Sequence, residues 1–227
     1  MRPTVVLFDV DGTLVVTGGA GRRALARAFG EVCGREDAMK GVELGGMTDR
    51  LILRAGLEAL GRAFDERTAE ALIEAYLGHL PDEVARSNGY RVLPGCRDAI
   101  AALARRPGFA LGLGTGNVRR GAEIKLSRGG LDASFPFGGF GCDHEDRVEL
   151  LRAGARRGAE QLGVERGACR VVVVGDTPRD VTAARGIGAE CVCVETGGSA
   201  AAELLDLGAT AAFPDLSAPG ALEAIAG

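Results

Sequence analysis

The most informative stretch of this sequence is TVVLFDVDGT, at residues 4–13. Its first five residues are apolar or β-branched, a pattern typical of a parallel strand that is buried on both faces. Asp9 and Asp11 follow at once, and Gly12 allows the chain to turn. In open α/β sheets, sites form just beyond the carboxyl ends of the strands. Residues 4–13 therefore predict a buried strand that leads directly into a functional site.

Beyond Asn88-Gly89 the sequence alternates between strand-like and helix-like segments. The predicted strands span residues 110–113, 135–140, 170–174, 191–194 and 211–213. The predicted helices span residues 94–105, 118–127, 147–162, 179–185, 199–207 and 216–225. Strands that alternate with helices predict an α/β fold built on a doubly wound parallel sheet, with a Rossmann-like core.

Residues 18–87 show a different pattern, because apolar stripes at helical spacing follow one another and no strand candidate interrupts them. Thr48 and Asp65 are suited to be N-caps of helices in this block. Since the block stands between the first strand and the rest of the sheet, we interpret residues 16–88 as an inserted all-helical cap. The α/β core then comprises residues 1–15 and 89–227.

Composition excludes several classes of protein. The chain has 227 residues, of which 46% are hydrophobic and 26% charged, so it can bury a core. Its net charge of −4 and its lack of basic runs argue against nucleic acid as a partner. No apolar stretch approaches the roughly 20 residues that span a bilayer, and no signal-peptide pattern is present. Scattered cysteines suit a reducing compartment, so we expect a cytoplasmic monomer or homodimer that binds no membrane.

Polar clusters follow three of the predicted strands. They are DVDGT at residues 9–13, GTGN at 114–117 and GDTPRD at 175–180. If these strands are neighbours, four carboxylates and a hydroxyl converge on one crevice, and so much buried negative charge is costly without a cation. Oxygen ligands in this number suit a hard ion such as Mg²⁺. A phosphate is then the natural substrate group, because metal ions neutralise the charge of a transferring phosphoryl group.

In this order, DVDGT, GTGN, a lysine and GDTPRD resemble the motifs of the haloacid dehalogenase superfamily of aspartate-nucleophile phosphatases. The helical block resembles the cap that many members insert after the first motif. The resemblance covers nearly the whole chain and implies a magnesium-dependent phosphatase for a small phosphorylated metabolite, similar to phosphoglycolate-phosphatase-like members. The alternatives are a phosphomutase of the same fold and a non-catalytic phosphate-binding module. Asp11 argues against the module, because a binder has no use for it.

The resemblance implies a role for each residue of the first two motifs. Asp9 would attack phosphorus and become an aspartyl phosphate. Asp11 would protonate the leaving alkoxide and then deprotonate the water that hydrolyses the intermediate. Thr115 would hydrogen-bond a phosphoryl oxygen, together with the backbone N–H groups of Gly116 and Asn117 at a helix start.

The resemblance also predicts the metal ligands. Asp176 would bind Mg²⁺ beside Asp9 and the backbone carbonyl of Asp11. Asp180, four residues further on, would lie on the same face of the following turn. It would support either the metal or the lysine of the third motif.

The third motif of the superfamily supplies a lysine, and two residues of this chain could fill that role. Many members place it just before the strand that leads into the last motif, where this sequence has no lysine but has Arg147. The chain contains only two lysines, Lys40 and Lys125. Lys125 lies about two turns into the helix that starts at Asn117, and helical side chains lean toward the N-terminus. We therefore predict that Lys125 is the catalytic lysine, with Arg147 as the alternative.

One segment of the cap, GGMTDR at residues 45–50, is a candidate specificity loop. If it reaches over the crevice, Arg50 would bind an anionic group of the substrate. The simpler interpretation is a helix N-terminus capped by Thr48, with Arg50 on a solvated face. The sequence leaves both interpretations open.

Overall fold

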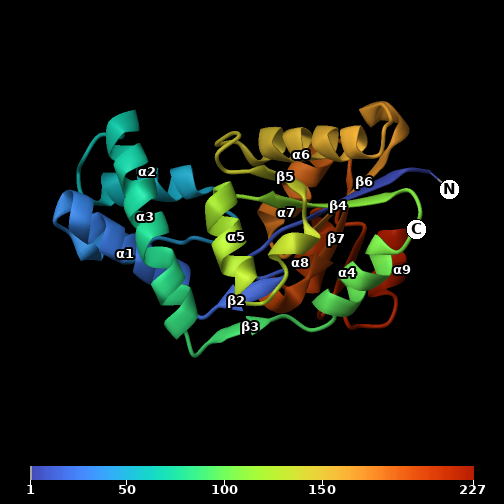
Figure 1. Ribbon diagram of the computed structural model, residues 1–227, viewed down its shortest axis with the longest axis horizontal. Coiled ribbons are helices and arrows are strands. Elements are labelled where there is room, and N and C mark those ends of the chain that lie inside the picture. The colour runs from blue at the N-terminus through green and yellow to red at the C-terminus, as the bar shows by residue number, and fades with distance from the viewer. Residues whose placement is uncertain (1) are drawn as a thin grey trace.

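The computed structural model describes residues 2–227, so Met1, which we assigned to the predicted core, lies outside the described residues. A parallel six-stranded sheet lies at the centre, in the order β5-β4-β1-β6-β7-β8 (Figure 1). Its strands are β1 (Thr4–Phe8), β4 (Phe109–Thr115), β5 (Phe137–Phe140), β6 (Arg170–Gly175), β7 (Glu190–Val194) and β8 (Ala211–Phe213). β1 pairs with β4 on one side and with β6 on the other, so the three motif-bearing strands are neighbours.

Helices cover both faces of this sheet. On one face lie α4 (Cys96–Ala104), α5 (Arg119–Ser127) and α9 (Ala221–Ala226); on the other lie α6 (Arg147–Gln161), α7 (Pro178–Gly186) and α8 (Ala201–Asp206). Alternate residues of β1 serve the two faces, because strand side chains alternate in direction. Val6 and Phe8 pack with the first group, and Val5 and Leu7 with the second. The predicted doubly wound α/β fold is confirmed.

The inserted block consists of α1 (Ala20–Cys33), the short 3₁₀ helix η1 (Glu36–Met39), α2 (Asp49–Ala59) and α3 (Glu66–Arg86). These helices lie at the left of Figure 1, far from both chain ends, and they share a hydrophobic cluster of their own. The N–H of Leu51 donates to Thr48 Oγ1 at 3.4 Å, and the N–H of Thr68 donates to Asp65 Oδ1 at 2.9 Å. Both predicted N-caps therefore act as caps. The division of the chain at residues 16 and 88 stays a prediction.

Two short strands that the sequence did not reveal lie where the inserted block begins and ends. β2 (Val15–Thr17) pairs in antiparallel fashion with β3 (Tyr90–Val92). Ser87 Oγ also donates to the carbonyl of Thr17 at 2.7 Å. Strands of three residues carry no periodic signal, and their partners are far apart in the chain, so only the folded structure identifies them.

Helix α5 belongs to both parts of the molecule. Ala122 and Leu126 pack into the cluster on the sheet, whereas Val118 and Ile124 pack into the cluster of the inserted helices. Contacts between α5 and α3 join the two parts. Lys125, the predicted catalytic lysine, lies on α5 and therefore at the seam between the core and the inserted helices.

One predicted helix is shorter than expected. The sequence predicts a last helix over residues 216–225, but α9 begins only at Ala221. Gly220, just before it, has a φ of 88°, a left-handed conformation that no helix interior can contain. None of the helices within residues 2–227 combines the length and the hydropathy that a membrane crossing needs.

Candidate active site

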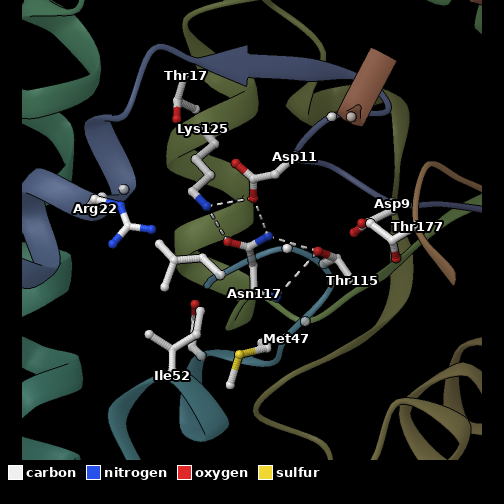
Figure 2. A pocket seen from close by; sticks show the side chains of 18 of the residues that line it. Asp9, Asp11, Thr17, Arg22, Met47, Ile52, Thr115, Asn117, Lys125 and Thr177 are labelled. Carbon is white, nitrogen blue, oxygen red and sulfur yellow. Dashed lines mark hydrogen bonds and ion pairs between the residues drawn. The ribbon is translucent and has the colours of Figure 1, made fainter. Parts of the chain in front are cut away.

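The carboxyl ends of β4, β1 and β6 open into a pocket of about 370 Å³ (Figure 2). We call its core side the floor, which comprises Asp9, Asp11, Thr115, Gly116, Asn117, Lys125, Arg147 and Asp176. We call its other side the roof, formed by the inserted helices and comprising Arg22, Leu25, Leu44, Met47, Asp49, Ile52 and Tyr76. The structure thus brings together most of the site residues predicted from the sequence. Arg50 and Asp180 are the two that do not line the pocket.

Three buried carboxylates lie together at one end of the floor. Asp9, Asp176 and Asp180 each offer an oxygen within 4.8 Å of the others. Burial raises the pKa of Asp9 to about 6, although the nearby Arg147 opposes the shift. Burial, together with the charges of Asp180 and Asp9, raises the pKa of Asp176 to about 9. The proximity of these groups makes their full ionisation costly without a further cation.

Asp176 is held by close packing around its carboxylate. Thr13 Oγ1 donates to Asp176 Oδ1 at 2.7 Å. Gly12 lies directly against the other oxygen, because a Cβ at this position would come within 2.5 Å of Asp176 Oδ2. Gly12 also has a φ of 83°. The glycine of the first motif is therefore required both for its turn and for the approach of Asp176.

Asp180 supports the site from beneath rather than lining it. Its Oδ2 accepts hydrogen bonds from the N–H and the hydroxyl of Thr177, at 3.0 and 2.7 Å, in the capping box of α7. Its Oδ1 accepts from Arg147 Nε at 3.0 Å and Nη2 at 2.5 Å. Because both oxygens are engaged, Asp180 fits the supporting role better than that of a direct metal ligand. The metal-ligand role predicted for it stays a prediction, because Asp180 also offers an oxygen within 4.8 Å of those of Asp9 and Asp176.

The two candidate cations of the third motif both reach the floor, and each pairs with a different aspartate of the first motif. Lys125 Nζ donates to Asp11 Oδ2 and to Asn117 Oδ1, both at 2.6 Å. Arg147 Nη2 lies 3.0 Å from Asp9 Oδ2. Burial is the largest single effect and would lower the pKa of Lys125, but Asp11, Tyr76 and Asp49 together outweigh it and raise that pKa. Both cations therefore stay charged at neutral pH.

Asn117 links the second motif to the first. Its Nδ2 donates to Thr115 Oγ1 at 2.8 Å and to Asp11 Oδ2 at 2.9 Å, as the dashed lines in Figure 2 show. Together with Lys125 it fixes the orientation of the Asp11 carboxylate. Gly116 completes the segment, because a Cβ there would come within 2.3 Å of the carbonyl oxygen of Met47 in the roof. The segment over residues 115–117 thus joins floor and roof.

The structure places Arg50 away from the pocket. Its Nη2 pairs with Glu66 Oε1 at 2.7 Å, and its guanidinium lies 5.4 Å from the ring centroid of Phe64. Arg50 is the second residue of α2 and is not among the buried residues of that helix. The geometry corrects the expectation of a substrate contact and favours the solvated helix face.

The sequence did not reveal two charged residues of the roof. Arg22 lies in the first turn of α1, and Asp49 is the first residue of α2. The N–H of Val118 donates to Asp49 Oδ2 at 2.7 Å, and burial raises the pKa of Asp49 to about 6. Asp49 is preceded by the predicted cap Thr48, but a first-turn acid is ordinary in a helix. Nothing in the local pattern distinguishes Arg22 from the neighbouring Arg23.

Comparison with known proteins identifies relatives across most of the chain. A family model described as haloacid dehalogenase-like hydrolase matches residues 3–188. A phosphoglycolate phosphatase of Rhodospirillum rubrum is 32% identical over 225 residues, which cover 96% of this chain and 90% of that protein.

Solved structures share the fold at lower identity. A hydrolase from Pseudomonas syringae superposes with a TM-score of 0.67 and 22% identity, with 94% of each chain covered. A mutant of CbbY from Rhodobacter sphaeroides, in complex with xylulose-(1,5)bisphosphate, superposes with a TM-score of 0.71 and 18% identity, with 99% of each chain covered. At these identities the structures support the fold alone.

The family match and the relative at 32% identity agree with the motif geometry and with the fold. The resemblance noted in the sequence and the predicted enzyme class are confirmed. The chain belongs to the haloacid dehalogenase-like hydrolases, as a phosphatase of that family.

Proposed function

We propose that this protein hydrolyses a small phosphorylated metabolite in a magnesium-dependent reaction that passes through an aspartyl phosphate on Asp9. One observation carries the proposal. The buried carboxylates of Asp9 and Asp176 lie beside the hydrogen-bonded set of Asp11, Lys125 and Asn117 in one small pocket. This combination supplies a nucleophile, an oriented acid–base group and a cation site within the reach of one phosphate.

The donor chemistry of the floor fits Mg²⁺. Asp9 and Asp176 offer hard oxygen ligands, and no hydrogen bond engages Asp176 Oδ2 among residues 2–227. The raised pKa values of both groups reflect negative charge that a cation would relieve. Asp9, Asp176 and the backbone carbonyl of Asp11 would hold the ion, which when bound would neutralise charge on the phosphoryl group.

Asp9 would act as the nucleophile. Its carboxylate oxygen attacks phosphorus, the ester P–O bond breaks, and the leaving alkoxide takes a proton from Asp11. A water molecule then loses a proton to Asp11 and attacks the aspartyl phosphate. Inorganic phosphate leaves and Asp9 is regenerated. Arg147, 3.0 Å from Asp9 Oδ2, favours the ionised nucleophile before the reaction.

The remaining floor residues would bind the phosphoryl oxygens and orient the acid–base group. Thr115 Oγ1 and the backbone N–H groups of Gly116 and Asn117, just before α5, would donate to the phosphoryl group. Lys125 and Asn117 already hold Asp11 Oδ2, so they would direct its other oxygen toward the leaving group. The relative from Rhodospirillum rubrum, named a phosphoglycolate phosphatase, suggests a short phosphate ester as the substrate.

Phosphate release from a set of small phosphate esters, with and without Mg²⁺, tests the proposal. We expect release with Mg²⁺, loss of release in excess chelator, and recovery when Mg²⁺ is restored in excess over the chelator. Full activity after exhaustive dialysis into chelator would contradict the proposed site. Phosphate that moves to another hydroxyl of the substrate without release, followed by ³¹P NMR, would assign the chain to the phosphomutase alternative.

A further inference from the structure

Arg22 lies on the roof, across the pocket from the floor. It belongs to the first turn of α1, and Figure 2 shows its guanidinium pointing into the pocket on the side of Lys125. Its Nη1 donates to the carbonyl of Met39 at 2.6 Å, and its Nη2 donates to the carbonyl of Val42 at 2.7 Å. These two carbonyls fix the guanidinium, and the remaining N–H groups are available to a ligand.

Arg22 differs from the other two cations of the pocket in its charge balance. Lys125 pairs with Asp11, and Arg147 pairs with Asp9 and Asp180. Arg22 has no carboxylate oxygen within 4.0 Å in the part of the chain that the structure describes, residues 2–227. Its two carbonyl partners carry no net charge, so its own charge is uncompensated within the protein.

The other roof side chains leave little else to bind a polar substrate. Leu25, Leu44, Met47 and Ile52 are apolar, and burial raises the pKa of Tyr76, so its hydroxyl stays neutral. The Asp49 carboxylate already accepts from the N–H of Val118. A ligand with its phosphate on the floor would therefore meet one anion-binding group on the roof, which is Arg22.

We propose that Arg22 binds a carboxylate on the leaving group of the substrate and thereby selects short phosphate esters that carry a second negative charge. This inference rests on the proposed function, because it places the phosphate on the floor. A guanidinium matches a carboxylate with two parallel N–H donors. The pocket of about 370 Å³ has room for such an ester. A single cation also balances a carboxylate better than it balances a second phosphate.

Two substrates of nearly equal size test this role. Phosphoglycolate carries the carboxylate, and 2-hydroxyethyl phosphate carries a neutral hydroxymethyl group in its place. We expect Arg22→Ala and Arg22→Gln to lower kcat/KM for phosphoglycolate by about 10- to 150-fold, as for a lost hydrogen-bonded charge pair. Both variants should change kcat/KM for 2-hydroxyethyl phosphate by less than about threefold. Arg22→Gln keeps an amide that can donate to a carbonyl, so it separates the loss of charge from the loss of cap structure.

Arg23→Ala is the matched control. Arg23 follows Arg22 on α1, pairs with Glu83 at 2.8 Å and does not line the pocket. We expect no selective loss on phosphoglycolate in this variant. Equal losses on both esters in the Arg22 variants would show that Arg22 only supports the inserted helices. No loss on either ester, or a wild-type preference for the neutral ester, would also overturn the inference.

Failure of the proposed function is distinguishable from failure of this inference. If the wild type releases phosphate from neither ester, the proposed function fails on these substrates. Calorimetry of the same esters with wild type and Arg22→Gln, in the presence of Mg²⁺, then decides the role of Arg22. Binding of phosphoglycolate that is tighter than that of 2-hydroxyethyl phosphate, and that Arg22→Gln weakens at least tenfold, would support it. Equal affinities for the two esters in the wild type would refute it.

Discussion

The floor and the roof of the pocket differ in how their charged side chains are balanced. On the floor, Lys125 and Arg147 are both paired with carboxylates, and Asp9 and Asp176 still have raised pKa values. On the roof, apolar side chains line the pocket beside Arg22, which is exposed and has no carboxylate partner within residues 2–227. The floor therefore attracts a cation and the roof an anion. This difference suggests that chemistry depends on the floor and selectivity on the roof.

The two sides also differ in what fixes them. Most floor residues follow parallel strands whose register is set by pairing along the whole of β1, whereas Lys125 and Arg147 come from α5 and α6. The roof residues come from the first two turns of α1, from residues 44–52 that lead into α2, and from α3, and contacts between α3 and α5 join them to the core. Substitutions on the floor should therefore change kcat or the stability of the core. Those on the roof should change substrate preference and the docking of the inserted helices.

The largest effect is expected for Asp9→Asn. An amide cannot attack phosphorus, so kcat should fall by several orders of magnitude while the fold is retained. Steady-state kinetics gives the loss, and circular dichroism with urea unfolding gives the control for folding. Residual activity within about tenfold of the wild type would refute Asp9 as the nucleophile and would remove the basis for the contrast between floor and roof.

Substitution of the two floor cations, Lys125 and Arg147, should have different consequences, one mainly for kcat and the other mainly for stability. The side chain of Asp11 is 43% exposed, so Lys125→Ala leaves a carboxylate that water can solvate. Asp180 has a side-chain exposure of 0%, so Arg147→Ala leaves an unpaired buried charge. We expect Lys125→Ala to lower kcat by about 100- to 1000-fold. We expect Arg147→Ala to lower the free energy of unfolding by about 3–5 kcal/mol and to lower kcat less than Lys125→Ala does.

Kinetics at a temperature where all variants are folded, together with urea unfolding, measures both quantities. Arg147→Lys is the matched control, because it keeps the charge without the planar fork that meets Asp9 and Asp180. It should recover part of the stability. A larger loss of kcat in Arg147→Ala than in Lys125→Ala would assign the third-motif role to Arg147.

The smallest effect concerns Asp49 at the junction of roof and floor. Its pKa is raised from 3.8 to about 6 by burial, so between these values the folded state binds more protons than the unfolded state. Stability therefore falls as the pH rises through this window, by at most about 3 kcal/mol for this group. Asp49→Asn stays neutral and can still accept from Val118. Its stability relative to the wild type should increase from pH 4 to pH 7, as urea unfolding would measure.

Asp65→Asn provides the control of opposite sign. The N–H of Thr68 lowers the pKa of this exposed N-cap, so its carboxylate stabilises the folded state above pH 3.8. The stability of Asp65→Asn relative to the wild type should decrease as the pH rises through that value. If the difference in stability between Asp49→Asn and the wild type does not change with pH, burial does not raise the pKa of Asp49.

Local sequence patterns by themselves determined the sheet and most of the floor. The runs rich in β-branched residues form the buried strands β1 and β6, and the first and last motifs follow those strands directly in the chain. Once β1, β4 and β6 are neighbours, Asp9, Thr115 and Asp176 converge without further information. Pattern and position are sufficient here because each residue is placed by its own strand.

The tertiary structure alone decided the pairings between elements. It placed Lys125 against Asp11 and Arg147 against Asp9, and it turned Arg22 rather than Arg50 into the pocket. It also revealed the pairing of β2 with β3. These contacts depend on how separate helices and strands cross in space, and no local pattern of charge or hydropathy contains that crossing. For this reason the sequence predicts the nucleophile, whereas only the fold shows which arginine faces the pocket.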